Sequence, residues 1–352
     1  MTSRMRAEIK ETPQVLERLL RDGRPAIREA AAAIRSAAPR FAVVVARGTS
    51  DHAGTYARYV VEARLGIPAG MAAPSVITLY RSTLDWRDVL LIAISQSGRS
   101  PDLVAVTEAA RLGGALTLAV TNHPESPLAA AVDLLVPCHA GEELSVAATK
   151  TYVAELTALA AVLGEAAEDR ELVEALPRLP EAAAAAVAAG EAWLAGSGSP
   201  VGVFSEGSNA HVVGRGYNYA TALEIALKLK EAAQLFADGY STADLMHGPI
   251  AVARPGTPVL AFRPDGPAGP AVDQVLRRLV DAGSPTWVVG AQPVPARLAR
   301  SIPVCPVAPD LPEVLSPVPL VLPGQLLAEA VAMARGLDPD APPGLSKVTH
   351  TV

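Results

Sequence analysis

Short runs of apolar residues alternate with longer amphipathic segments along most of this chain. Runs with strand character, such as VLLIAI at 89–94, are about five residues long and are followed by helical segments of about twelve residues. Strands that alternate with helices in this way pair in a parallel sheet with helices on both faces. The pattern therefore predicts an α/β fold of the doubly wound type.

The alternation occurs twice, because the sequence contains an internal repeat with an offset of 168 residues. The matched pairs are 44–48 with 212–216, 91–94 with 259–262, 117–121 with 285–289, and 133–136 with 301–304. Four matched elements without a gap predict two tandem copies of one α/β unit.

Sequence composition divides the chain into five segments. An Ala-rich stretch between the two copies is typical of a connecting helix that ends in a Gly/Ser turn, and a turn-rich tail follows the second copy. The predicted segments are an N-terminal helix or helical pair at 1–38, a first α/β domain at 39–164, the connecting helix at 165–199, a second α/β domain at 200–335, and the tail at 336–352.

Composition argues against several classes of protein. The chain of 352 residues has a formal net charge of −6 with acidic and basic residues interspersed, which disfavours a nucleic-acid-binding surface. No apolar run approaches membrane-spanning length and the N-terminus has no signal-peptide core, so we expect a cytoplasmic protein without a membrane partner. Cys138 and Cys305 are too few for a disulfide framework and are expected to be inert core residues.

One turn at the end of a predicted strand has the composition of an anion site. Residues 95–100 are SQSGRS, and they join an apolar strand to an amphipathic helix that opens with Pro101. Backbone N–H groups at a helix N-terminus suit a phosphate. A second hydroxyl turn, Gly48-Thr49-Ser50, follows another strand of the same copy. Serines in such turns also serve as plain helix caps, but two turns at neighbouring strand ends favour a ligand.

The sequence also indicates the kind of phosphate. Neither a GxxxxGK[ST] loop nor a GxGxxG motif occurs at this turn, so we expect a small phosphorylated metabolite rather than a nucleotide. The second copy has RPDG at 263–266 where the first has SQSG at 95–98, and it has lost the hydroxyls. One phosphate site is therefore expected in each chain.

Three further features carry groups that could move protons or form an imine. Glu224, Lys228 and Glu231 are spaced to share one face of a mostly apolar helix, with a solvated charge ladder as the alternative. His247 precedes Gly-Pro in a loop and can act as an acid or base near neutral pH, unless it is merely structural. Lys347 could form a Schiff base if the tail folds into a pocket, and is otherwise a solvated lysine.

Seven motifs occur in the order found in one family. They are EIKETPQVL, RGTSDHAG, ISQSGRSPD, ELSVAATKTY, ALEIALKLKE, DLMHGP and LSKV, and they span almost the whole chain. On these motifs the chain resembles the sugar isomerase (SIS) family, in particular the isomerase portion of glucosamine-6-phosphate synthase and its stand-alone relatives. The resemblance implies two SIS subdomains, a sugar 6-phosphate substrate, and no metal or organic cofactor.

The resemblance also assigns roles to residues. Glu231 would move a proton between C1 and C2, His247 would assist ring opening from the neighbouring subunit of a homodimer, and Lys347 would form an imine with the open-chain ketose. Glu224 and Lys228 would orient these groups. The two hydroxyl turns and main-chain groups of the fourth motif would bind the phosphate and the sugar. The residues concerned are Gly48, Thr49, Ser50, Ser95, Gln96, Ser97, Ser100, Val146 and Ala148.

Departures from the synthase pattern bear on the reaction. Residue 2 is threonine and no cysteine precedes Cys138, so a glutaminase is not expected; Ala148 stands where the synthase usually has serine, and Met246 where it has lysine. The leading hypothesis is a glucosamine-6-phosphate deaminase that forms fructose 6-phosphate and ammonia. The enzymatic alternatives are a fructosamine-6-phosphate deglycase and an ammonia-dependent synthase.

A non-catalytic sugar-phosphate sensor is the alternative from another class. Such a sensor would usually carry a DNA-binding helix, and residues 1–38 contain no basic recognition helix. A sensor would also have no need for Glu231, His247 and Lys347 together. These two points favour an enzyme.

Overall fold

The computed structural model describes residues 2–292, 296–307 and 310–347 of the chain. The chain forms two compact units, and each contains one parallel sheet of five strands. The first-sheet unit comprises Gln14–Glu143, Lys150–Pro177 and Ser346–Val352. The second-sheet unit comprises Met1–Pro13, Leu144–Thr149 and Arg178–Leu345.

The first-sheet unit alternates strands and helices as the hydrophobic pattern predicts. Its strands are β1 (Phe41–Val45), β2 (Ala69–Met71), β3 (Val89–Ser95), β4 (Leu116–Thr121) and β5 (Leu134–Pro137). Its helices are most of α2 (Thr12–Asp22), then α3 (Arg24–Ala37), α4 (Thr49–Val60), α5 (Pro74–Thr78), α6 (Pro101–Leu112), α7 (Pro127–Ala130), α8 (Lys150–Ala166) and α9 (Arg170–Ala175). The strand order is β2-β1-β3-β4-β5.

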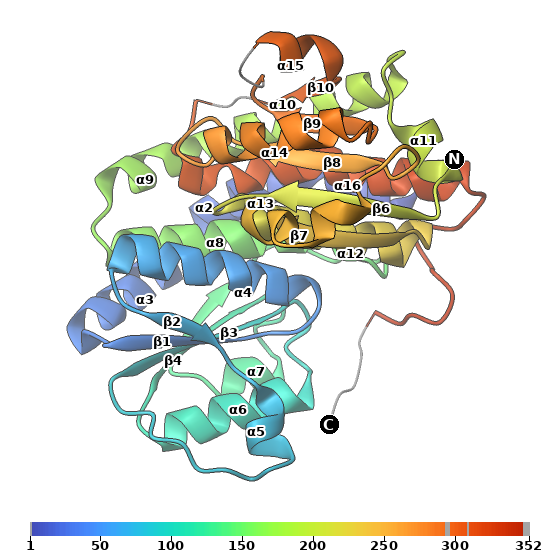
Figure 1. Cartoon of the computed structure of the whole chain (residues 1–352). Helices are drawn as coiled ribbons and strands as arrows, with labels where there is room; N and C mark the ends of the chain where they lie inside the picture. Colours follow the sequence, from blue (N-terminus) through green and yellow to red (C-terminus); the bar gives the residue numbers. More distant parts are fainter. Residues whose placement is uncertain (1, 293–295, 308–309, 348–352) are drawn as a thin grey trace. The chain divides into compact units, whose positions relative to one another are not determined.

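Helices cover both faces of the first sheet, as a strand that is buried on both sides requires. On one face, Leu91 and Ala93 of β3 pack in a cluster with Leu103 and Val106 of α6. Figure 1 shows α4 and α8 on the opposite face. Because β1 and β3 are parallel neighbours, their carboxyl ends meet at one edge of the sheet, where the two hydroxyl turns begin.

The second-sheet unit repeats this architecture. Its strands are β6 (Asn209–Gly214), β7 (Phe236–Ser241), β8 (Val259–Arg263), β9 (Thr286–Gly290) and β10 (Val304–Pro306). Its helices are α1 (Arg4–Lys10), α10 (Leu179–Ala195), α11 (Val201–Glu206), α12 (Asn218–Ala233), α13 (Thr242–Met246), α14 (Gly269–Asp281), α15 (Ala296–Ser301) and α16 (Pro317–Ala334). The strand order is β10-β9-β8-β6-β7.

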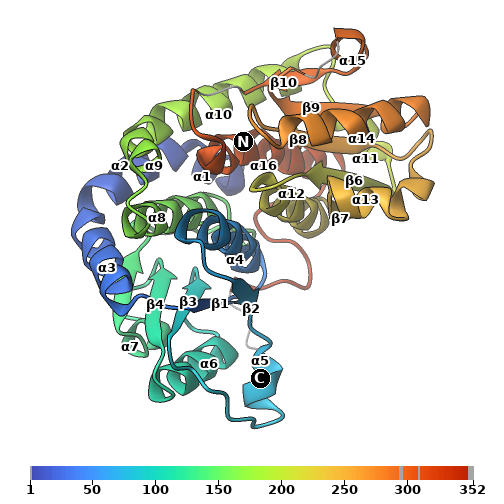
Figure 2. The same cartoon turned by 60° about the vertical axis from the view of Figure 1, so that its left-hand side comes forward.

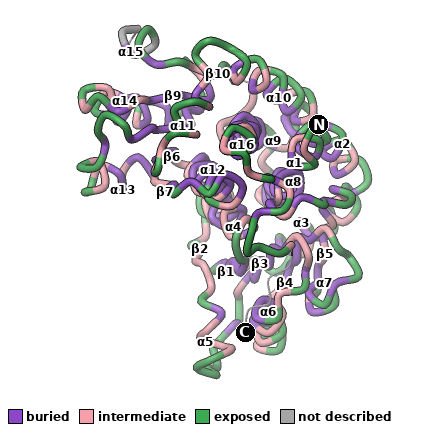
Figure 3. Tube along the Cα trace, turned by 90° about the vertical axis from the view of Figure 1, so that its right-hand side faces the viewer, coloured by how far each residue is buried: buried purple, intermediate pink, exposed green. Residues whose placement is uncertain are grey.

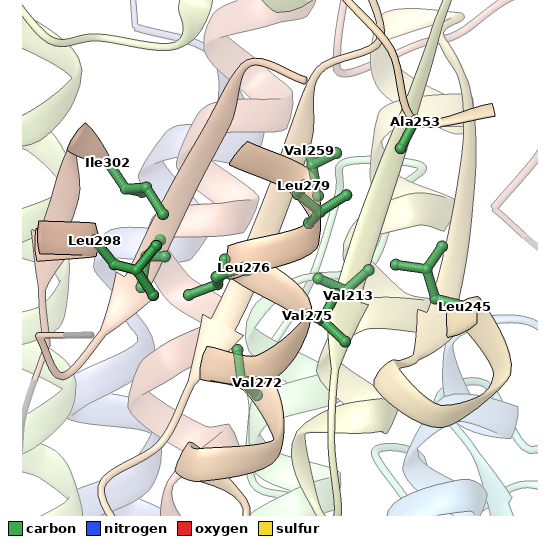
Figure 4. Close-up of a cluster of buried hydrophobic side chains, with 12 residues drawn as sticks. Val213, Leu245, Ala253, Val259, Val272, Val275, Leu276, Leu279, Leu298 and Ile302 are labelled. Carbon is green, nitrogen blue, oxygen red and sulfur yellow. The ribbon is translucent and has the colours of Figure 1, made fainter. Parts of the chain in front are cut away.

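The second sheet also carries helices on both faces. An apolar cluster joins α14 to one face, and Figure 4 shows Val272, Val275 and Leu276 of that helix among strand residues that include Val213 and Val259. The helices α12 and α16 lie on the opposite face (Figures 1 and 2). Both are buried along most of their length, as the tube in Figure 3 shows, which accounts for their strongly apolar sequences.

The two sheets share one topology, which confirms the predicted fold class of two tandem doubly wound α/β subdomains. The order β7-β6-β8-β9-β10 matches β2-β1-β3-β4-β5 strand by strand. The pairing of Ala210 with Ala237 repeats the pairing of Ala42 with Ala69 at the predicted offset of 168 residues.

The predicted gap-free repeat is wrong by one residue in its later strands. Leu91 of β3 pairs with Thr117, whereas Val259 of β8 pairs with Thr286, so the offset at the third matched strand is 169. The extra residue falls in the intervening helix, because α14 has 13 residues and its counterpart α6 has 12.

Segments outside the repeat differ from expectation in three places. Residues 1–38 form three helices, where one or two were predicted. The stretch 165–199 is not a single helix, because α8 ends within it and a short 3₁₀ helix, Leu176–Arg178, which contains Pro177, separates α9 from α10. The segment Glu313–Ala334 is long and apolar enough to cross a membrane, which corrects the expectation that no such run exists, but 94% of its apolar window is buried inside the structure.

Candidate active site

The turn after β3 is held in a fixed shape by its neighbours. Gly98 has φ of +62°, and a Cβ there would lie 2.1 Å from the hydroxyl oxygen of Ser126, so only glycine fits. The Leu128 N–H donates to the Gly98 carbonyl over 3.1 Å, and the Asn122 N–H donates to the Gln96 carbonyl over 3.2 Å. The loop is therefore pre-organised by the adjacent strand and helix.

Hydroxyl groups in this turn accept hydrogen bonds from the backbone. Ser95 Oγ accepts from the Gly98 N–H over 3.1 Å, and Ser97 Oγ accepts from the Arg99 N–H over 3.3 Å. Each hydroxyl thus keeps its own proton for another acceptor. Ser100 stands at the N-cap of α6 but makes no side-chain capping bond, so its hydroxyl is not used as a plain helix cap.

The second hydroxyl turn is tied to the first. Arg47 Nε donates to Asp102 Oδ2 over 2.8 Å, which joins the turn after β1 to the first turn of α6. Gly48 has φ of +57° and precedes α4, where Thr49 and Ser50 are the first two residues. Within the first-sheet unit, the structure therefore brings together the two turns that the sequence predicted to be neighbours.

Ser50 differs from the other serines because its hydroxyl donates to a carboxylate. Its Oγ donates to Glu155 Oε1 over 2.9 Å, and both residues are buried, with exposed fractions of 6% and 1%. Burial, followed by the charges of Glu155 and Glu143, holds the pKa of the Cys138 thiol well above its ordinary value. Two buried carboxylates therefore lie near Cys138, and sequence reasoning missed both.

Lys347 is paired with one of these carboxylates. Its Nζ donates to Glu143 Oε2 over 3.2 Å, and the other Glu143 oxygen accepts from the Thr151 N–H. The Glu143 side chain is fully buried, whereas that of Lys347 is 26% exposed. Glu143 is the first residue of the ELSVAATKTY motif, so an acidic residue within a recognised motif was the available signal.

The segment with Val146 and Ala148 belongs to the second-sheet unit. The Val146 N–H donates to the Asp340 carbonyl over 3.1 Å, and Glu8 of α1 accepts from the backbone N–H groups of Leu144 and Ser145. Because the N–H of Val146 is already used, a main-chain contact from this residue to a sugar would have to come from its carbonyl group.

The three charged residues of α12 form one cluster, as their spacing predicts. Lys228 is fully buried and lies 3.5 Å from Glu224 Oε1, which is also fully buried. The Lys228 ammonium also contacts Glu231 Oε2, whose side chain is 24% exposed. The cluster therefore ends in one carboxylate that reaches solvent, and the solvated charge ladder is excluded.

His247 lies on another element of the same unit. It follows α13, whose N-terminus is capped by the Ser241 hydroxyl, and its N–H donates to the Asp244 carbonyl. The histidine is exposed, and Gly248 after it has φ of +139°. Among the described residues, no group of three or more His, Cys, Asp or Glu side chains is arranged to hold a metal ion.

The second copy has a carboxylate of its own where the first has a hydroxyl turn. Glu313 Oε2 accepts from the Ala268 N–H over 3.1 Å at the start of α14. A Cβ on Gly266, the counterpart of Gly98, would lie 2.3 Å from the same oxygen. A Cβ on Gly216, the counterpart of Gly48, would lie 3.4 Å from Glu313 Oε1. This carboxylate therefore lies between the two turns that correspond to the candidate site.

Comparison with known proteins agrees with this architecture. The SIS domain model matches residues 38–164 and 204–286. The glutamine–fructose-6-phosphate aminotransferase of Thermococcus kodakarensis is 34% identical over 354 residues, which cover 97% of this chain and 57% of that protein. The chain thus spans little more than half the length of such relatives.

Two solved structures cover nearly the whole chain. A protein from Silicibacter pomeroyi, provisionally named a phosphosugar isomerase, has a TM-score of 0.88 at 36% identity and covers 96% of this chain and 100% of its own. The C-terminal domain of glucosamine-fructose-6-phosphate aminotransferase from Francisella tularensis has a TM-score of 0.83 at 25% identity, over 97% of this chain and 99% of that domain. The chain therefore belongs to the SIS family, and its relatives within that family are the isomerase portions of these aminotransferases.

Proposed function

We propose that this protein is a phosphosugar isomerase that converts glucosamine 6-phosphate and water to fructose 6-phosphate and ammonia. The observation that carries the proposal is the Glu231 carboxylate, which buried Lys228 holds in place at the edge of the solvent. A fixed carboxylate of this kind can move a proton between two adjacent carbons. Amination of fructose 6-phosphate by free ammonia is the reverse reaction, and one site accelerates both directions.

The phosphate would bind in the turn after β3. The hydroxyls of Ser95 and Ser97 keep protons to donate, and the neighbouring turn contributes the N-terminus of α4. Glu313 supports this assignment, because a negatively charged group lies at the corresponding place in the second copy. Gln96 and Ser100 would complete the cradle, with the Thr49 backbone beside them.

The proton steps would be divided among three residues. His247 would assist opening of the sugar ring, and Glu231 would then take the proton from C2 of the open-chain amino aldose and return it at C1. As a second proton passes from the nitrogen to O1, the C1 aldehyde becomes a hydroxymethyl group and the C2 amine becomes an imine. Glu224 would hold Lys228, and Lys228 would hold Glu231, so that the base keeps its position during both steps.

Lys347 would release the ammonia. Its neutral amine would attack the C2 imine and displace ammonia, and water would then hydrolyse the new imine to the free ketose and the amine. An amine attacks only when its nitrogen lone pair is free, so any proton on that lone pair would have to leave first. Glu143, whose Oε2 lies 3.2 Å from the Lys347 nitrogen, would accept that proton.

The proposal includes a homodimer in which His247 serves the neighbouring subunit. The exposure of His247 in the single chain is compatible with this arrangement. A cytoplasmic location is likewise part of the proposal.

Coupled assays in both directions test the proposed function. The protein should release ammonia from glucosamine 6-phosphate and should form glucosamine 6-phosphate from fructose 6-phosphate and ammonia. A folded protein that does neither would refute the proposal. Turnover of fructosamine 6-phosphate in place of the amino sugar would indicate a deglycase, and binding of sugar phosphates without conversion would indicate a sensor.

A further inference from the structure

Ser50 differs from the other serines of the candidate site in the direction of its hydrogen bond. It donates to Glu155, whereas Ser95 and Ser97 accept from backbone N–H groups. A serine hydroxyl has one proton and two acceptor lone pairs. The Ser50 proton is therefore used in the hydrogen bond to Glu155, and the hydroxyl oxygen can only accept a hydrogen bond from a ligand.

The direction of this bond is firmly set. Glu155 lies in the buried helix α8 and is 1% exposed, and an ionised carboxylate is purely a hydrogen-bond acceptor. A hydroxyl bonded to a carboxylate makes one of the stronger hydrogen bonds found in proteins. If the Ser50 hydroxyl turned to donate to a ligand, its hydrogen bond to the buried Glu155 carboxylate would break.

A phosphate dianion presents acceptor oxygens only, so it gains nothing from the lone pairs of Ser50. We propose, building on the function proposed above, that Glu155 makes Ser50 an acceptor for the amino group of the substrate and that Ser50 takes no part in holding the phosphate. The ion pair between Arg47 and Asp102 joins the turn that precedes Ser50 to the phosphate turn, and the proposal has one bound molecule contact both. The negative charge of Glu155 favours an ammonium group over a neutral hydroxyl at this place.

Calorimetric titration with three ligands tests this role. The ligands are glucosamine 6-phosphate, glucose 6-phosphate and inorganic phosphate. Glu155→Gln and Ser50→Ala should each weaken glucosamine 6-phosphate about 10- to 100-fold, the range expected for one hydrogen bond to a charged group. Both should leave the affinity for inorganic phosphate unchanged. Ser97→Ala should weaken all three ligands by the same factor.

Two controls separate this role from a structural one. Thr157→Val removes another buried polar group of α8, whose hydroxyl bonds to the Val153 carbonyl of its own helix, and should change no affinity. The double variant Ser50→Ala/Glu155→Gln should lose less binding free energy for glucosamine 6-phosphate than the two single losses summed, because Glu155 acts largely through Ser50. Additive losses, or an equal loss for inorganic phosphate, would overturn the inference.

The binding measurements are independent of turnover. If the wild-type protein shows this selectivity but releases no ammonia, the deaminase proposal fails and the role of Glu155 stands. If ammonia is released and Glu155→Gln leaves the ratio of sugar-phosphate to phosphate affinity unchanged, the role of Glu155 fails alone.

Discussion

Replacing Lys228 by methionine should separate the stability of the α12 cluster from its chemistry. Lys228 and Glu224 are both fully buried, with Nζ and Oε1 3.5 Å apart. Two unit charges at that distance attract by about 5 kcal/mol at an effective dielectric constant of about 20. Removing one partner of a buried pair costs about 3–5 kcal/mol, because the remaining charge loses its counter-ion. Lys228→Met should therefore lower the free energy of unfolding by that amount.

The double variant Glu224→Gln/Lys228→Met provides the matched control. It removes both buried charges, so its stability should return to within about 1–2 kcal/mol of the wild type. Glu231 keeps contact with solvent and does not add a buried charge. The double variant should fold and still be a poor catalyst, because Glu231 has lost the ammonium that positions it.

Urea unfolding followed by circular dichroism measures the stabilities, and ammonia release measures the activity. If Lys228→Met were as stable as the wild type, Glu224 would not carry a buried charge, and the account of the cluster would be wrong. If the double variant regained both stability and full activity, Lys228 would not position the base.

Four further predictions concern Glu231, Lys347, Glu313 and the two cysteines. Glu231→Gln should lower kcat about 10²- to 10⁴-fold, the loss expected for a general base, and should leave urea unfolding unchanged. Lys347→Ala should abolish the covalent adduct with substrate that borohydride reduction traps and mass spectrometry detects. Normal activity in both variants would contradict these roles. Glu313→Ala should lower the free energy of unfolding in urea by about 1–2 kcal/mol, since the Ala268 N–H at the start of α14 loses its acceptor. An unchanged free energy of unfolding would show that the carboxylate is not needed there. Burial raises the pKa of Cys305 to about 12 and that of Cys138 well above its ordinary value. Both should therefore stay neutral thiols at pH 8 and react with thiol reagents only after the chain unfolds. Rapid labelling of the native protein would refute this.

Local patterns were enough to predict the parts of the site that lie within one element. The spacing of Glu224, Lys228 and Glu231 fixes their positions on a helix face, because helical geometry relates residues three and four apart. The turn at 95–100 follows from an apolar strand, a hydroxyl-rich loop and a helix start. In each case a short window of sequence contains all the information that is needed.

Contacts between distant residues could not be predicted in this way. Glu143 pairs with a lysine 204 residues away, and Glu155 with a serine 105 residues away. Glu155 stands in an apolar helix, as Glu224 does, but the residues around Glu155 or Glu143 do not show which distant side chain each one meets. Burial of these carboxylates depends on the assembled sheet, which brings their partners to them.

The comparison between the two copies adds an argument that neither copy provides alone. The same strand ends and helix starts occur in both sheets, so geometry by itself would predict two anion sites. In the second copy, the Glu313 carboxylate already accepts from the N–H at the start of α14, and a second anion there would be repelled. In the first copy, the corresponding turn has hydroxyls with protons to donate and a glycine packed tightly against Ser126. The two turns therefore differ in the source of the negative charge. In the second copy a side chain of the protein supplies it, and in the first copy the proposed phosphate ligand would supply it.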